Sequence, residues 1–132
     1  MRPLILLALL GLVACGSPTD NAVSDHYDLR EVTGTAPVGG TPDGWLTVFH
    51  DGRFRLAMWS EENEEPRQAD FTGTYLEAGD VLTLTVTRFC TAHTGTVSTC
   101  PASPVASLAA VRSGSTVTVT AGTAWSATFV RK

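Results

Sequence analysis

The feature that most constrains the fold is an alternation of apolar and polar residues that recurs along the chain between glycine-containing turns. The clearest case is 80–89, where Leu82, Leu84 and Val86 alternate with threonines. A period of two is that of a strand with one buried face, and no segment keeps a helical period. The sequence predicts an all-β fold, a single small antiparallel up-and-down β-barrel of about eight strands.

The register of one hairpin follows from its apolar residues. A three-residue turn at His50-Asp51-Gly52, with Gly52 in the left-handed conformation, pairs Val48 with Phe54. A two-residue turn at Asp51-Gly52 would divide the apolar side chains between two faces, so we expect the longer turn. The residues then predicted to face inward are Leu46, Val48, Phe54, Leu56 and Met58. Those predicted to face outward include Thr47, Arg53 and Arg55.

Two other strands carry specific expectations. In the strand predicted over 26–32, Tyr27, Leu29 and Glu31 lie on one side. Gly73 stands in the middle of another strand, where a glycine indicates a bend or a close approach of backbones. A bend of this kind helps a small sheet to curl into a barrel.

The first residues have the form of an export signal. Arg2 precedes an apolar run from Leu4 to Val13, which is too short to span a bilayer that needs about 20 residues. The sequence Leu12-Val13-Ala14-Cys15 resembles the lipobox of bacterial lipoproteins. That resemblance implies cleavage before Cys15 and acylation of its sulfur and amino group, with palmitate among the expected chains, and an anchor on the exported side of a membrane. The alternative is an ordinary secretory signal that leaves Cys15 as a free thiol.

The chain therefore divides into three parts. Residues 1–14 are the predicted lipoprotein signal peptide, residues 15–25 the lipidated cysteine with a flexible tether, and residues 26–132 one small domain. The formal net charge of −4 argues against nucleic acid as a partner. We expect a monomer in the bacterial cell envelope, attached to a membrane through Cys15.

The two other cysteines are predicted to form a disulfide. Cys90 and Cys100 remain as a pair once Cys15 is assigned to lipid, and an exported protein matures in an oxidising compartment. A loop of this size contributes roughly 3 kcal/mol in the chain-entropy model. The alternative is a metal site of Cys90, His93 and Cys100, which lacks an evident fourth ligand. We expect no metal and no other cofactor.

A further resemblance covers most of the domain. The turn His50-Asp51-Gly52, the run Gly73-Thr74-Tyr75 and the threonine-leucine strand after it look like the small lipocalin-like β-barrel domains of bacterial lipoproteins. The first strand, with Gly34 after it, is also similar to the beginning of such domains. The resemblance implies the fold and the location, and it carries no catalytic residue.

The sequence favours binding over catalysis. His26, His50 and His93 have no carboxylate or nucleophile at a known catalytic spacing, and no catalytic motif is present. We therefore expect no enzyme activity and no catalytic residues. One candidate partner is a small apolar ligand inside the barrel. Its lining would be aromatic, and the same residues would otherwise be packed core: Tyr27, Phe71, Tyr75, Trp125 and Phe129.

The other candidate function is a protein-interaction or inhibitor module on the envelope. The hairpin register places Trp45, Phe49 and Trp59 on the outer face, where they could form a contact patch or be covered by loops. The Cys90–Cys100 loop is a second possible contact. Ser113-Gly114-Ser115 is similar to the inhibitory loop of lipoprotein lysozyme inhibitors, but the tyrosine and lysine expected around that loop are missing.

Overall fold

The computed structural model describes residues 23–60, 68–92 and 98–132. These residues form eight strands: β1 (Val23–Gly34), β2 (Asp43–Phe49), β3 (Arg53–Trp59), β4 (Gln68–Ala78), β5 (Val81–Ala92), β6 (Ser107–Ser113), β7 (Thr116–Ala121) and β8 (Trp125–Arg131). In this part of the chain, no helix is long and apolar enough to cross a membrane. β1 begins at Val23, earlier than the predicted start of the domain at residue 26.

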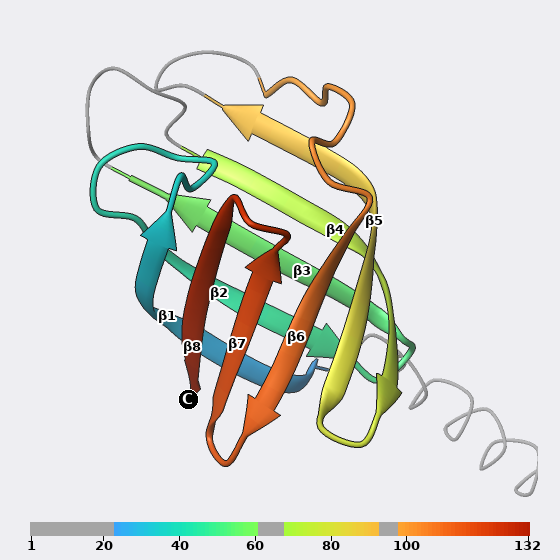
Figure 1. Cartoon of the computed structure of the whole chain (residues 1–132). Helices are drawn as coiled ribbons and strands as arrows, with labels where there is room; N and C mark the ends of the chain where they lie inside the picture. Colours follow the sequence, from blue (N-terminus) through green and yellow to red (C-terminus); the bar gives the residue numbers. More distant parts are fainter. Residues whose placement is uncertain (1–22, 61–67, 93–97) are drawn as a thin grey trace, which may run out of the picture.

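The strands form one closed antiparallel barrel (Figure 1). Each strand pairs with its neighbours in sequence, and β1 pairs with both β2 and β8. In Figure 1, β6, β7 and β8 lie in front, and β2, β3 and β4 cross behind them. The predicted fold class, a single up-and-down barrel of eight strands, is confirmed.

The predicted hairpin register is also confirmed. Val48 pairs with Phe54 and Leu46 with Leu56, and Gly52 has a φ of 89° in the turn between β2 and β3. The five side chains predicted to face inward are all buried. Thr47 lies on the outer face as predicted, yet it is buried there beside His26, with which it forms a 2.8 Å hydrogen bond.

The first strand departs from its predicted alternation. A bulge between Leu29 and Glu31 shifts the pairing of β1 with β8. After the bulge the phase is reversed, so Val32 packs against the core and Glu31 is exposed. The prediction that Glu31 shares a face with Tyr27 is therefore wrong, because a strict period of two cannot anticipate an inserted residue.

The two ends of the barrel are closed by different side chains. We call the upper end the one at which β4 and β8 begin, and the lower end the one at which β8 finishes. At the upper end Phe71 lies 4.8 Å from Phe89 and 6.1 Å from Trp125, between ring centroids. Val38, from the loop between β1 and β2, is buried in the same apolar core.

The lower end is polar. Arg112 Nη1 lies 2.7 Å from Glu77 Oε2, and Arg131 Nη2 lies 3.2 Å from Asp25 Oδ1. Arg131 Nη2 also donates to the hydroxyl of Tyr27 at 3.1 Å. Arg112 and Arg131 continue the inward phase of β6 and β8. Their guanidinium groups therefore lie at the lower mouth of the barrel, at the end of the core.

Candidate functional site

The structure packs most of the predicted ligand lining into the core. Four of these residues are at most 6% exposed and belong to one continuous hydrophobic cluster: Tyr27, Phe71, Trp125 and Phe129. Tyr75 is partly buried against the same cluster, and its hydroxyl donates to the backbone carbonyl of Phe49 at 2.9 Å. This arrangement matches the packed-core alternative, and a role in lining a ligand site stays a prediction.

One hollow of about 240 Å³ lies between the end of β1 and the loop that follows it, and is lined by Val32, Gly34, Thr35, Ala36, Val38, Gly39, Gly40 and Pro42. Two others lie on the outside of the barrel wall. One of about 460 Å³ is lined by Phe49, Arg53, Phe54, Arg55, Thr72, Gly73, Thr74 and Thr87. A second of about 320 Å³ is lined by Arg55, Asp70, Thr72, Arg88, Cys90 and Ser98. The two share Arg55 and Thr72 and therefore adjoin. We call them together the outer-wall groove.

The groove follows from the order of side chains across the paired strands. One row of cross-strand partners runs Thr47, Arg55, Thr72, Arg88, and the next runs Trp45, Ala57, Asp70, Cys90. Large side chains thus alternate with small ones on the outer face. Ala57 is only 1% exposed although it lies on this face, which shows that its larger neighbours rise above it. Small residues form the floor and long side chains form the sides.

The predicted aromatic patch lies beside this groove. Trp45, Phe49 and Trp59 are all on the outer face and half-buried. The guanidinium of Arg55 lies 5.2 Å from the Trp45 ring centroid, and that of Arg53 lies 5.3 Å from the Phe49 centroid. Two of the three rings are therefore partly covered by arginines, in cation–π contacts. The outer wall presents arginine and aromatic groups together, and a role in contacting a partner stays a prediction.

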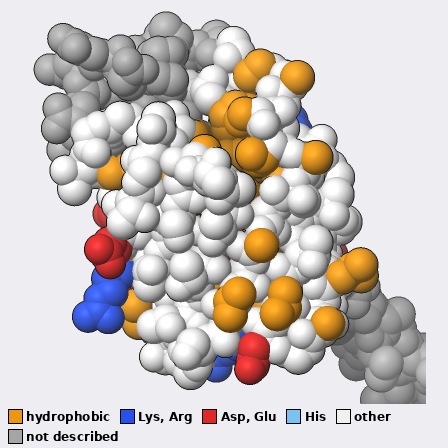
Figure 2. Space-filling model, in the orientation of Figure 1, with side chains coloured by type: hydrophobic (Ala, Val, Ile, Leu, Met, Phe, Trp, Pro, Cys, Tyr) orange, Lys and Arg blue, Asp and Glu red, His pale blue; other side chains and the backbone are white. Residues whose placement is uncertain are grey.

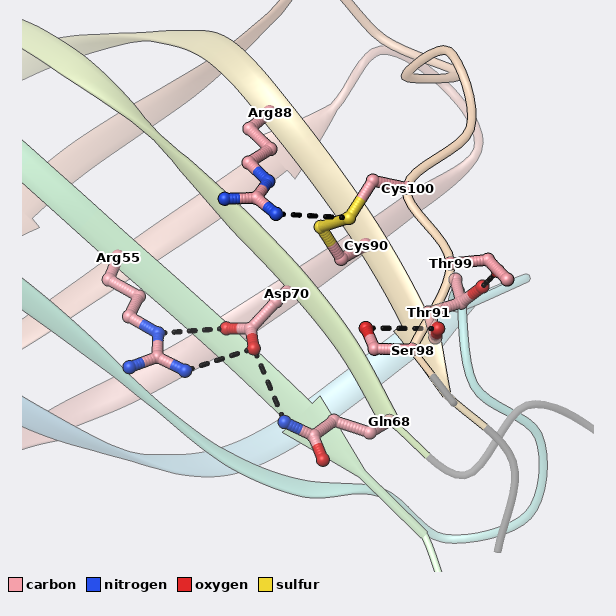
Figure 3. Close-up of a disulfide and its surroundings, with 9 residues drawn as sticks. All are labelled: Arg55, Gln68, Asp70, Arg88, Cys90, Thr91, Ser98, Thr99 and Cys100. Atoms are coloured by element: carbon pink, nitrogen blue, oxygen red, sulfur yellow. Dashed lines mark hydrogen bonds and ion pairs between the residues drawn. A yellow bond between two sulfur atoms is a disulfide. The ribbon is translucent and has the colours of Figure 1, made fainter. Parts of the chain in front are cut away.

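An ion pair fixes the middle of the groove (Figure 3). Arg55 Nε and Nη2 donate to the two carboxylate oxygens of Asp70, each at 3.0 Å. Gln68 Nε2 donates to Asp70 Oδ2 at 3.2 Å. The hydrogen bonds with Asp70 raise the pKa of Arg55 above its usual value. The pair is bidentate, the geometry that gives an arginine and a carboxylate their orientation.

The upper rim of the groove is formed by the disulfide. Cys90 and Cys100 are bonded, with an S–S distance of 2.11 Å, as predicted. Two backbone hydrogen bonds between Thr91 and Thr99, at 2.7 and 2.9 Å, hold the segment after the loop against β5. Figure 3 shows Arg88 pointing toward the sulfurs, with Nη2 at 3.5 Å from Cys100 Sγ. The cross-link therefore holds the backbone beside Arg88.

A bulge in β5 sets the position of Arg88. The partner of Thr72 is Arg88 and the partner of Gly73 is Val86, so Thr87 is an inserted residue. Val86 and Phe89 pack inward on either side, and the side chains of Thr87 and Arg88 are both exposed on the outer wall. The predicted alternation of β5 holds as far as Thr87 and misses this phase change. The step from Val86 to Phe89, three positions between apolar residues, was the available signal.

Gly73 allows the close approach that its position predicted. A Cβ at Gly73 would lie 1.8 Å from the carbonyl oxygen of Thr85. Gly73 shares the inward phase of Phe71, and the backbones of β4 and β5 meet more closely here than any side chain would permit.

Several predictions fall on residues that the structure does not describe. Cys15, the signal peptide over 1–14 and most of the tether over 15–25 lie outside the described residues, as does His93 of the alternative metal site. Within residues 23–60, 68–92 and 98–132, no three His, Cys, Asp or Glu side chains are grouped so that they could hold a metal ion.

The arginines of the lower end were not predicted as a cluster. The Nε of Arg112 is buried and has no hydrogen-bond partner in the structure. Its Nη1 donates to Glu77, and this hydrogen bond raises the pKa of Arg112 above its usual value. The signal lay in the alternation, since Leu108, Ala110 and Arg112 share one phase.

The fold and the groove define a small all-β barrel with a groove on its outer wall. No protein-family model matches this chain, and neither the curated proteins nor the solved structures contain a match to it.

Proposed function

We propose that this barrel is the noncatalytic binding domain of a lipid-tethered envelope protein, and that it binds a partner protein on its outer wall. The observation that carries the proposal is the contrast between the two possible sites. The aromatic side chains predicted to line the interior are packed into one core, and the outer wall of β2–β5 carries an open groove beside half-exposed aromatic rings.

The opposite wall supports this choice of surface. The outward residues of β7 and β8 are Thr116, Thr118, Thr120, Ser126, Thr128 and Val130. Figure 2 shows that the face in front, over β6–β8, is mostly uncharged, with few charged groups at its margins. Aromatic and arginine side chains are the residues that protein interfaces favour, and serine is depleted there. Aromatic and arginine side chains lie on the wall of β2–β5, whereas the outward residues of β6–β8 are hydroxyl-bearing and aliphatic, among them Val111 at 50% exposed.

The tether and location are part of the same proposal. The lipobox-like sequence ending at Cys15 supports acylation, and the Cys90–Cys100 disulfide supports an oxidising compartment outside the cytoplasm. Metabolic labelling with a palmitate analogue tests the anchor. We expect the full-length chain to be labelled and membrane-bound, and the Cys15→Ser variant to be unlabelled. An unlabelled, soluble wild type would contradict the tether.

Site-specific photocrosslinking tests the binding surface. A photoreactive residue is placed at Trp59 or Thr74 on the outer wall of β3 and β4, and at Thr118 on the outer wall of β7 as the matched control. In cells that make the protein, we expect defined cross-linked products from the first two positions and none from the third. Equal products from all three, or products from Thr118 alone, would contradict the proposed surface.

Native mass spectrometry of the full-length chain tests the other candidate function, the binding of a small apolar ligand inside the barrel. A co-purifying small molecule that is lost on denaturation would favour the barrel interior as the binding site. A chain that carries only its acyl groups and one disulfide is the result we expect.

A further inference from the structure

The groove gathers positive charge on a chain that is acidic overall. The formal net charge is −4, yet Arg53, Arg55 and Arg88 all line the outer-wall groove. Arg55 is held by Asp70, and Arg53 Nε lies 2.6 Å from Asp51 Oδ2. Arg88 differs from both, because its Nη2 donates to the sulfur of Cys100 at 3.5 Å. Among the described residues, no carboxylate oxygen lies within 4.0 Å of its guanidinium.

The position of Arg88 is built by the fold. The bulge turns it outward, next to Thr87, and the disulfide holds the neighbouring backbone. Bulges serve in other proteins to aim a side chain at a binding site. An exposed arginine on a fixed strand, with its fork of donors pointing into a hollow, is suited to a planar anion.

The neighbouring hollow is less polar. Phe49 lines it from the outer face of β2, and Phe54 and Gly73, which also line it, are in the inward phase of β3 and β4. Thr72, Thr74 and Thr87 add neutral hydroxyl groups to this hollow, and Thr72 also lines the second one. The groove therefore offers an apolar place and a cationic place side by side.

We propose that the outer-wall groove binds an acidic peptide segment of the partner protein, with a carboxylate on Arg88 and an apolar side chain beside Phe49. This inference rests on the proposed function and names the chemistry of its partner. The Arg55–Asp70 pair shows that this wall accommodates a carboxylate in bidentate contact with an arginine. The barrel is closed, so the segment binds through its side chains and not as an added strand.

A binding titration tests the proposal directly. The full-length chain, purified in a mild non-ionic detergent, is titrated with a fluorescent peptide in which leucine and glutamate alternate, and binding is followed by polarisation. We expect saturable binding that weakens as salt rises, and a loss of about fivefold in affinity in Arg88→Gln. The peptide in which glutamine replaces glutamate should bind much more weakly than the acidic one.

Arg30→Gln is the matched control. Arg30 is exposed on β1 and does not line the groove, so this variant removes the same charge elsewhere. It should bind the acidic peptide as the wild type does. Equal losses in the two variants, or no binding of the acidic peptide, would overturn the inference.

A sulfated polysaccharide distinguishes the other class of acidic partner. If it binds more tightly than the peptide and this binding depends on Arg88, the groove takes a glycan and the inference is wrong. The photocrosslinking result is independent of these titrations. Suppose that cross-links are confined to the wall of β3 and β4 and that Arg88→Gln does not change the affinity for the acidic peptide. The proposed function would then stand, and only the inference of an acidic segment would be wrong.

Discussion

Side chains close both ends of the barrel, but the two sets of side chains have opposite chemistry. The upper end is filled by apolar rings around Phe71, and the lower end is closed by arginines, carboxylates and tyrosine hydroxyls around Arg112. Burying rings removes apolar surface from water, whereas the partly exposed ion pairs of the lower end contribute little net free energy. The comparison teaches that the upper end stabilises the barrel, and that the lower end covers the mouth at little net gain.

The largest loss of stability should come from a substitution at the upper end. Phe71→Ala removes a fully buried ring that contacts both Phe89 and Trp125. We expect the free energy of unfolding to fall by about 3–5 kcal/mol, measured by urea denaturation. A fall below about 1 kcal/mol would show that the upper end is loosely packed and would break the comparison.

The second-largest loss of stability should come from removing the disulfide. The double variant Cys90→Ser/Cys100→Ser releases the segment that the bond holds against β5. We expect a loss of roughly 3 kcal/mol in the free energy of unfolding. Reduced wild-type protein is the control, and it should unfold at the same urea concentration as the double variant. A midpoint unchanged by either treatment would contradict a stabilising role for the cross-link.

A substitution at the lower end should change the free energy of unfolding only slightly. Arg112→Met replaces a mostly buried arginine, whose Nε has no partner, with an apolar side chain of similar length. We expect the free energy of unfolding to stay within about 1 kcal/mol of the wild type. A double-mutant cycle with Glu77→Gln measures the coupling between the two residues, which should be below about 1 kcal/mol. A larger coupling would mean that the lower end also stabilises the barrel.

The smallest effect is a dependence on pH. Burial raises the pKa of Tyr75 above its ordinary value of 10.0, so the folded state favours the neutral hydroxyl. The resulting stabilisation is fully present below pH 10 and is lost as the pH rises through the raised pKa of the folded state. The midpoint temperature of thermal unfolding should therefore fall less steeply above pH 10 in Tyr75→Phe than in the wild type. Parallel curves would contradict this assignment.

The sequence was sufficient where local chemistry allows one register. The left-handed Gly52 and the apolar residues beside it specify the β2–β3 hairpin, and the structure has that pairing. Gly73 was recognisable because a strand tolerates a glycine there only when another backbone comes close. The number of strands followed from counting such units.

The sequence was insufficient where an inserted residue changes the phase. The bulges near Leu29 and at Thr87 depend on how two strands meet, which alternation within one strand does not contain. The groove was missed for this reason, since Arg88 faces it only after the bulge. Arg112 and Arg131 were missed because charged residues are expected outside a barrel, although their spacing from the core residues places them at its mouth.

The pairing of β1 with β8 also limits the order in which the molecule can be assembled. Tyr27 and Arg131 contact each other across 104 positions of the chain, and the backbone N–H of Lys132 donates to the carbonyl of His26. Contacts between such distant residues form slowly because a long loop must close first. During synthesis β8 emerges after the other seven described strands, so until then β1 and β7 each keep an open edge. A nascent chain is thus exposed to strand exchange until β8 can pair with both neighbours, and chaperone capture at this stage would protect it.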